Sequence, residues 1–168
     1  DIMERKVYLD SASTTYVNSE VLQEMMPMFN ANFGNSSSLH FYGRNASDKV
    51  DNARIKIAKS INAKPSEIYF TSGGTESDNW AVKGSVLVRD EYRRIVTTSI
   101  EHHAVLNCMK DLENQGFEVT YLQPDNLGNI SLDSLKTALR KDTILVSIMM
   151  VNNEVGSVMP IDKMAKLT

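Results

Sequence analysis

The first apolar pattern in the chain is helical. The apolar residues of segment 21–26 recur at a spacing that puts them on one face of a helix. Asn18 or Ser19 can cap the start of this helix, and Pro27 should kink or end it soon afterwards. The pattern therefore predicts a short amphipathic helix.

The next segments alternate between loop and helix. Segment 33–43 is rich in Gly, Asn and Ser, which predicts a long loop. Apolar residues at helical spacing over 46–61 predict a second helix with one apolar face, and segment 63–66 ends it. Ahead of both helices, segment 7–10 is predicted to be a short strand or an extended arm.

From residue 67 onward, short apolar runs alternate with helical patterns. The predicted strands cover 67–71, 94–98, 117–122 and 143–149. Helical patterns follow these strands: one over 75–88, one that carries Val105 and Leu112 and ends at Gly116, and one that Ser131 caps and that runs to Leu139. A turn cluster occupies 124–128, and Pro160 lies where the first turn of a further helix would start. The run 143–149 is almost continuously apolar, as in a strand buried on both faces. This order predicts an α/β fold with a mainly parallel sheet and helices on both faces.

Composition narrows the classes of function. Lys and Arg total 18 against 21 Asp and Glu, so the net charge of −3 gives no support to binding of nucleic acid or a membrane surface. No apolar run is long enough to cross a bilayer, and the first six residues lack the apolar core of a secretory signal, so we expect a cytoplasmic protein. Cys108 is the single cysteine, which excludes an internal disulfide.

Two glycines follow the predicted strand 67–71 and precede a helix. Gly73 and Gly74 allow a sharp turn, and backbone N–H groups at the helix start, with the Thr75 hydroxyl, can hold an anion such as a phosphate. The alternative is an ordinary tight turn with Thr75 as the helix cap. Glu76 and Asp78 would repel a phosphate unless they point sideways.

Two further polar segments also follow predicted strands. His102 could stack on an aromatic cofactor ring or transfer protons, although a histidine without a ligand is the alternative. Asn152, Asn153 and Glu154 either form a turn or supply an amide that donates to a phenolate-like oxygen. Because ligands bind at the carboxyl ends of parallel strands, segments 72–75, 99–103 and 152–156 together predict one site.

A metal site and a reactive thiol are the competing interpretations of this region. Glu101, His102, His103 and Cys108 could together bind zinc, but their spacing matches no structural zinc pattern. Cys108 lies well inside a predicted helix, whereas a nucleophilic thiolate favours a helix start or a cationic neighbour. We therefore expect Cys108 to be a buried packing residue and the site to hold no metal.

Taken together, these segments resemble the cysteine desulfurases. That family consists of pyridoxal 5′-phosphate enzymes of the class V aminotransferase group, with the fold type I large domain. The matching segments are YLDSASTT (8–15), NFGNSSSLH (32–40), FTSGGTESDN (70–79), EHHAVL (101–106), GFEVTYL (116–122) and VSIMMVNNEVG (146–156). Ser36 departs from the family, which usually has proline there.

The resemblance implies a role for each candidate residue. Gly74 and Thr75 would bind the cofactor phosphate, His102 would stack on the pyridine ring with possible proton transfer, and Asn153 would hydrogen bond to the ring oxygen. The implied reaction converts L-cysteine to L-alanine and leaves a persulfide on a loop cysteine. A sulfur-acceptor or scaffold protein for iron–sulfur cluster assembly, and a homodimer, are the partners that the resemblance implies.

The resemblance also divides the chain. We expect an N-terminal arm over 1–15 and the N-terminal part of the cofactor-binding large domain over 16–168, with the rest of that domain and the small domain absent. The family's Schiff-base lysine directly follows a Ser-x-His segment, and no lysine here does so. Cys108 does not match the family's loop cysteine. We therefore expect this chain to bind the cofactor weakly at most and to be inactive alone.

Three alternatives remain open on the sequence. A selenocysteine lyase or another class V enzyme would share the same motifs. A non-catalytic piece, or one half of a split enzyme that acts as a binding partner, would share them as well. An unrelated nucleotide-binding α/β domain would share only the glycine-rich turn and the alternating pattern.

Overall fold

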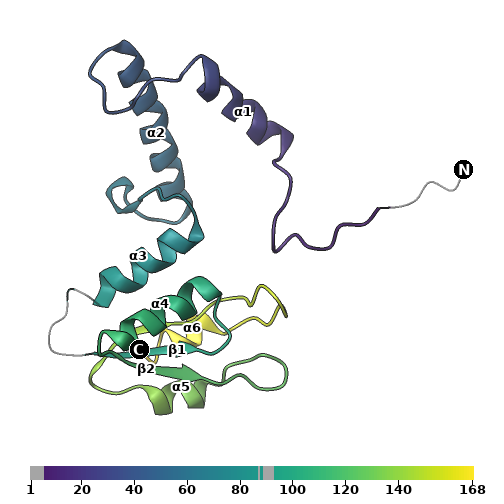
Figure 1. Cartoon of the computed structure of the whole chain (residues 1–168), viewed down its shortest axis with the longest axis vertical. Coiled ribbons are helices and arrows are strands. Elements are labelled where there is room, and N and C mark those ends of the chain that lie inside the picture. Colours follow the sequence, from purple (N-terminus) through teal and green to yellow (C-terminus); the bar gives the residue numbers. More distant parts are fainter. Residues whose placement is uncertain (1–5, 87, 89–92) are drawn as a thin grey trace, which may run out of the picture. The chain divides into compact units, whose positions relative to one another are not determined.

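The computed structural model describes residues 6–86, 88 and 93–168. The chain divides into two compact units, Asp1–Phe70 and Thr71–Thr168. Figure 1 shows their elements in chain order. Within the described residues, no helix combines the length and the apolar character that crossing a membrane requires. The predicted boundary between 15 and 16 stays a prediction.

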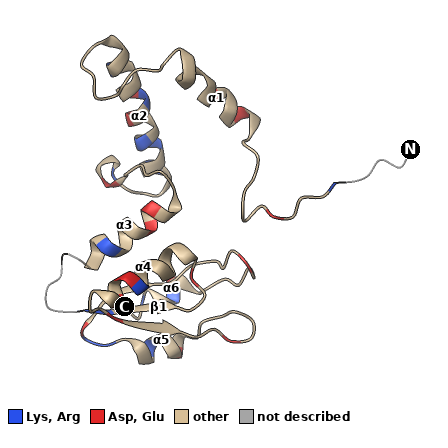
Figure 2. Cartoon of the chain, viewed as in Figure 1, with Lys and Arg blue, Asp and Glu red and all other residues tan. Residues whose placement is uncertain are grey.

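The first unit is built on two helices. Helix α1 spans Ser19–Asn30, with Asn18 as its N-cap, and it continues for three residues after Pro27. Helix α2 spans Phe41–Ser60. The predicted loop 33–43 therefore extends too far, because α2 already begins at Phe41. The His40 side chain caps this start by accepting the Gly43 N–H at 3.3 Å. Figure 2 shows basic and acidic residues interspersed along α2.

One strand prediction in this part of the chain is wrong, and the prediction of a strand or an arm for 7–10 resolves to the arm. Segment 7–10 has no strand pairing among the described residues, so the alternative of an extended arm holds. The predicted strand 67–71 is replaced by the short 3₁₀ helix η1, Pro65–Glu67, and an extended stretch without a strand partner in the described chain. Arg54 holds this stretch, since it donates to the Ile68 carbonyl and lies over the Phe70 ring, 4.9 Å from its centroid. An apolar run becomes a strand only where a neighbouring strand can pair with it.

The second unit contains a parallel sheet of three strands in the order β2-β1-β3. Strand β1 spans Arg94–Thr98, β2 spans Glu118–Leu122 and β3 spans Thr143–Ser147. The helices are α3 (Gly74–Val86), α4 (His103–Asn114), α5 (Leu132–Ala138) and α6 (Ile161–Met164). Arg94 pairs with Glu118 and Thr97 with Tyr121, so β1 and β2 run in register. The predicted parallel α/β order is confirmed from β1 onward.

Alternation along β1 builds a core on each face of the sheet. Ile95 faces the cluster formed with α3 and α4, which includes Val86 and Met109. Val96 faces the opposite cluster, formed with α5 and α6. Figure 1 shows α4 and α5 on opposite sides of the sheet. The prediction that helices cover both faces is therefore confirmed.

The strand buried on both faces is β1 and not β3. Every residue of β1 is buried, whereas every residue of β3 is only half-buried. The prediction for 143–149 was wrong because β1 lies between two strands, while β3 pairs on one side within the described residues. Strand β3 also ends at Ser147, two residues earlier than predicted.

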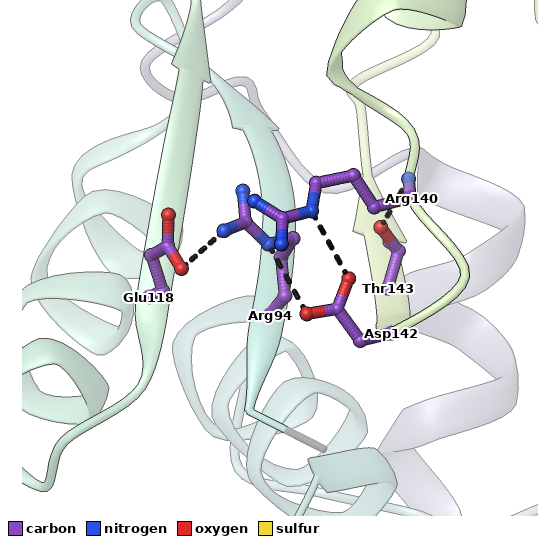
Figure 3. Close-up of polar contacts among 5 residues, drawn as sticks. All are labelled: Arg94, Glu118, Arg140, Asp142 and Thr143. Carbon is purple, nitrogen blue, oxygen red and sulfur yellow. Dashed lines mark hydrogen bonds and ion pairs between the residues drawn. The ribbon is translucent and has the colours of Figure 1, made fainter.

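Ion pairs join the beginnings of the three strands. Arg94, at the start of β1, pairs with Glu118 of β2, and its Nε lies 3.7 Å from Asp142 Oδ2 just before β3. Arg140 Nε lies 3.3 Å from Asp142 Oδ1 (Figure 3). The backbone N–H of Arg140 donates to Thr143 Oγ1. These contacts lie at the amino ends of the strands, which leaves the carboxyl ends for ligands.

Candidate functional site

Loops that follow all three strands meet around one pocket. The pocket has a volume of about 400 Å³ and lies at the carboxyl ends of the strands. Its walls come from 99–103 after β1, 126–128 after β2 and 152–155 after β3. The predicted convergence of the second and third segments is therefore confirmed. The contribution from 126–128 was missed, because its sequence indicated only a turn.

His102 lies at the point where the β1 loop becomes helix α4. It is the N-cap of α4, and its Nδ1 accepts the Ala104 N–H at 3.1 Å. Because Nδ1 accepts, the proton of the neutral ring is on Nε2. The side chain is exposed and lines the pocket beside His103, whose ring centroid is 6.4 Å away. The local fold thus fixes both the position and the tautomer of His102.

The two asparagines after β3 have different roles: one forms the turn and the other lines the pocket. Asn152 is buried, and its Oδ1 accepts the N–H groups of Glu154 and Val155, both at 2.9 Å. Its Nδ2 donates to the Ile100 carbonyl at 3.0 Å. Asn153 is exposed and lines the pocket, and no hydrogen bond from its side chain is formed among the described residues. Asn152 therefore forms the turn, while Asn153 leaves its amide available to a ligand.

Glu101 is a buried acidic residue in the wall of the pocket. Its Oε1 accepts the Thr98 hydroxyl at 2.7 Å and the Met149 N–H at 2.9 Å. Burial raises the pKa of Glu101, the two hydrogen bonds oppose that rise, and the charge of Asp78 adds to it. From the sequence, Glu101 was a candidate only for a zinc site. A carboxylate three residues after the end of a central strand is the signal that could have found its role.

Gly74 and Thr75 lie in the first turn of α3 and do not line this pocket. Helix α3 begins at Gly74, so Thr75 is inside the helix and the alternative of a Thr75 cap was wrong. A Cβ added at Gly73 or Gly74 would meet nothing within 4 Å, so packing does not require either glycine and the space beside them is open. Thr75 is exposed in this turn. The assignment of Gly74 and Thr75 to a phosphate stays a prediction.

The acidic residue next to this turn folds back onto the preceding loop. Glu76 Oε2 accepts the Ser72 N–H at 2.6 Å and the Ser72 hydroxyl at 2.7 Å. These bonds lower the pKa of Glu76. The carboxylate is thus bound to Ser72, on the N-terminal side of the turn.

Helix α3 is held against α4 beside the pocket. Lys83 Nζ and Asp111 Oδ2 form an ion pair at 2.5 Å between these helices. Asp78, one turn after Gly74, carries a negative charge that adds to the raised pKa of Glu101. The start of α3 and the pocket therefore belong to the same unit of the fold.

The described residues give no support to a zinc site or to a reactive thiol at Cys108. In the part of the chain that is described, no three His, Cys, Asp or Glu side chains are grouped to hold a metal ion. Cys108 is buried in α4, and burial raises the pKa of its thiol. A buried thiol with a raised pKa is a poor nucleophile. The prediction that Cys108 is a packing residue is confirmed.

The chain is similar in sequence to a known family and to proteins named as cysteine desulfurases. Residues 7–168 match the sequence model of the family described as Aminotransferase class-V. The chain is 49% identical over 164 residues to a protein named cysteine desulfurase IscS from Methanosarcina thermophila, covering 97% of this chain and 41% of that protein. It is 51% identical over 166 residues to putative cysteine desulfurase IscS 1 from Bacillus subtilis, covering 98% of this chain and 44% of that protein.

Solved structures of related proteins share the fold. A NifS-like protein superposes with a TM-score of 0.94 at 41% identity, covering 97% of this chain and 45% of that one. A structure described as SspA in complex with cysteine gives a TM-score of 0.90 at 42% identity, covering 95% and 46%. The chain thus spans less than half the length of the relatives it matches.

Proposed function

This chain belongs to the aminotransferase class-V family, and on that premise we propose that it is part of the cofactor-binding domain of a pyridoxal phosphate-dependent cysteine desulfurase. The names of relatives at 49% and 51% identity support the choice of desulfurase over selenocysteine lyase. The family match argues against an unrelated nucleotide-binding domain. The observation that carries the proposal is the pocket to which the loops after all three strands contribute, with His102 and Asn153 in its wall.

The residues present fit pyridoxal phosphate. His102 offers an exposed flat ring, and Asn153 offers a free amide that can donate to the ring oxygen. Gly74 and Thr75 offer helix N-terminal N–H groups beside open space, which suits the phosphate. When bound, the cofactor supplies an electron sink for bond breaking at the amino acid.

This chain's own residues orient the ring and handle a proton. The bond from the Ala104 N–H to His102 Nδ1 fixes the imidazole and leaves Nε2 as the proton-bearing atom. The Asn152 turn holds the backbone from which Asn153 reaches the pocket. L-cysteine as the substrate, a protein sulfur acceptor for iron–sulfur assembly, a homodimer and a cytoplasmic location belong to the proposal for the whole protein. The SspA relative, which was solved with cysteine, supports the choice of substrate.

Titration of the purified chain with pyridoxal phosphate tests the proposal. We expect a change in the cofactor's absorption on binding, and weaker binding in His102→Ala and Asn153→Ala. Asn107→Ala, which removes an exposed amide from α4, is the matched control. Equal affinity in all variants, or tighter binding of a nucleotide than of pyridoxal phosphate, would refute the proposal.

Two further measurements concern the reaction. We expect no cofactor mass to remain on the chain after borohydride treatment, because no lysine here directly follows a Ser-x-His segment. We also expect the isolated chain to produce no alanine from L-cysteine. Recovery of activity on mixing with the remaining half of a relative would favour a split enzyme over an inactive piece.

A further inference from the structure

Glu101 is the residue immediately before His102, and it connects two strand ends that are distant in sequence. Thr98, whose hydroxyl donates to Glu101 Oε1, is the last residue of β1. Met149, whose N–H donates to the same oxygen, lies two residues beyond the end of β3. Only 7% of Glu101 is exposed, so water does not substitute easily for these bonds.

A second buried side chain makes the reciprocal connection. Asn152, in the loop after β3, donates to the carbonyl of Ile100 in the loop after β1. Each loop therefore sends one buried polar side chain into the other. His102 follows Glu101 directly and Asn153 follows Asn152 directly, so each pocket residue is adjacent to one of these connections.

We propose that Glu101 is a positioning residue of this site, whose carboxylate holds the loop that carries His102 in register with the loop that carries Asn153. This role rests on the proposed function, because it concerns the cofactor only if His102 and Asn153 bind it. Glu101 acts through His102 and Asn153 and is not assigned contact with substrate or cofactor.

The two donors require a side chain with an acceptor oxygen at this position. Both the Thr98 hydroxyl and the Met149 N–H need an acceptor, and Glu101 supplies one oxygen to both. Burial raises the pKa of Glu101, so its ionised form is unfavourable for folding. The hydrogen bonds from Thr98 and Met149 oppose this rise and so offset part of the cost of burying the carboxylate.

The experiment uses the whole chain and three variants, without cofactor. Glu101→Ala removes both bonds, Glu101→Gln keeps an acceptor oxygen for both donors, and Glu113→Ala removes an exposed carboxylate from α4 as the control. For Glu101→Ala we expect amide exchange at Met149 to become about tenfold faster, as for loss of one hydrogen bond, and the ring resonances of His102 to shift. Glu101→Gln and Glu113→Ala should match the unmodified chain.

Three results would overturn the proposal. The first is an unchanged Met149 amide and His102 ring in Glu101→Ala. The second is a defect in Glu101→Gln as large as that in Glu101→Ala, which would assign the effect to charge. If Glu101→Ala does not fold, Thr98→Val removes one donor while keeping the buried branched shape, and it should give the same shifts at smaller amplitude. The third is Thr98→Val spectra identical to those of the unmodified chain.

Cofactor titration separates this inference from the proposed function. If the chain binds pyridoxal phosphate, Glu101→Ala should bind about tenfold more weakly, and Glu101→Gln should restore the affinity. Binding that is unchanged in Glu101→Ala contradicts the positioning role. If the unmodified chain binds no pyridoxal phosphate, the proposed function fails, and the resonances of Met149 and His102 still decide the role of Glu101.

Discussion

Replacing each of the two adjacent asparagines by alanine should separate stability from binding. Asn152→Ala removes the acceptor of the Glu154 and Val155 N–H groups, at 2.9 Å each, and the donor to the Ile100 carbonyl at 3.0 Å. All three bonds come from a buried side chain. Asn153→Ala removes an exposed amide that bonds to no described residue.

The magnitude follows from these three bonds. A net contribution of about 1 kcal/mol for each hydrogen bond gives a loss of about 3 kcal/mol in the free energy of unfolding of Asn152→Ala. With a urea dependence of about 2 kcal/mol per molar, the midpoint of unfolding should fall by about 1.5 M. An exposed substitution such as Asn153→Ala should change the free energy of unfolding by about 0.5 kcal/mol or less.

Urea unfolding followed by circular dichroism measures the first effect, and pyridoxal phosphate titration measures the second. We expect Asn153→Ala to unfold like the unmodified chain and to bind the cofactor more weakly. The reasoning is refuted if Asn153→Ala loses as much stability as Asn152→Ala, or if Asn152→Ala unfolds at the unmodified midpoint. Either result would mean that the turn does not depend on the Asn152 side chain.

Three other predictions follow from single residues. Gly116 has φ of +88° after α4, so Gly116→Ala should lower the free energy of unfolding by about 1 kcal/mol in urea, and an unchanged midpoint would contradict this. The hydrogen bond from Lys83 lowers the pKa of Asp111, so Lys83→Met should raise that pKa in an NMR titration, and no change would argue against the pair. Burial raises the pKa of Glu101 in the folded chain above 4.5, so its contribution to stability is present below that pH and is lost as the pH rises through the folded pKa. Glu101→Gln should remove this loss, which is measured as the free energy of unfolding against pH.

Local sequence signals predicted most of the second unit. Strand β1 was predicted at its observed bounds, Arg94–Thr98, since a short apolar run between turns has few alternatives. Ser131 caps α5 as expected, with its Oγ accepting the Ser134 N–H at 3.0 Å. The positive φ of Gly116 follows the same logic at the end of α4. Each of these features depends on neighbours in the sequence, which is why the sequence reveals them.

The errors concern features that depend on distant parts of the chain. The strand predicted over 67–71 lacks a partner among the described residues, and α2 holds that segment through Arg54 instead. Strand β3 has the more apolar sequence, yet β1 is the more buried because of its central place in the sheet. Hydrophobic pattern alone does not encode the order of strands in a sheet.

The same distinction governs the site. His102 and Asn153, which line the pocket, were named from motifs, because polar residues in the loops after predicted strands are visible in the sequence. Glu101 and Asn152, the residues next to them, were not predicted to join the two loops, because the partners that define this role are 48 and 52 positions away. A pocket residue can be recognised by its own chemistry, whereas the residue that positions it is defined by a contact that only the fold creates. Adjacent pairs with one exposed and one buried polar side chain, at the ends of neighbouring parallel strands, are therefore the pattern to seek in related chains.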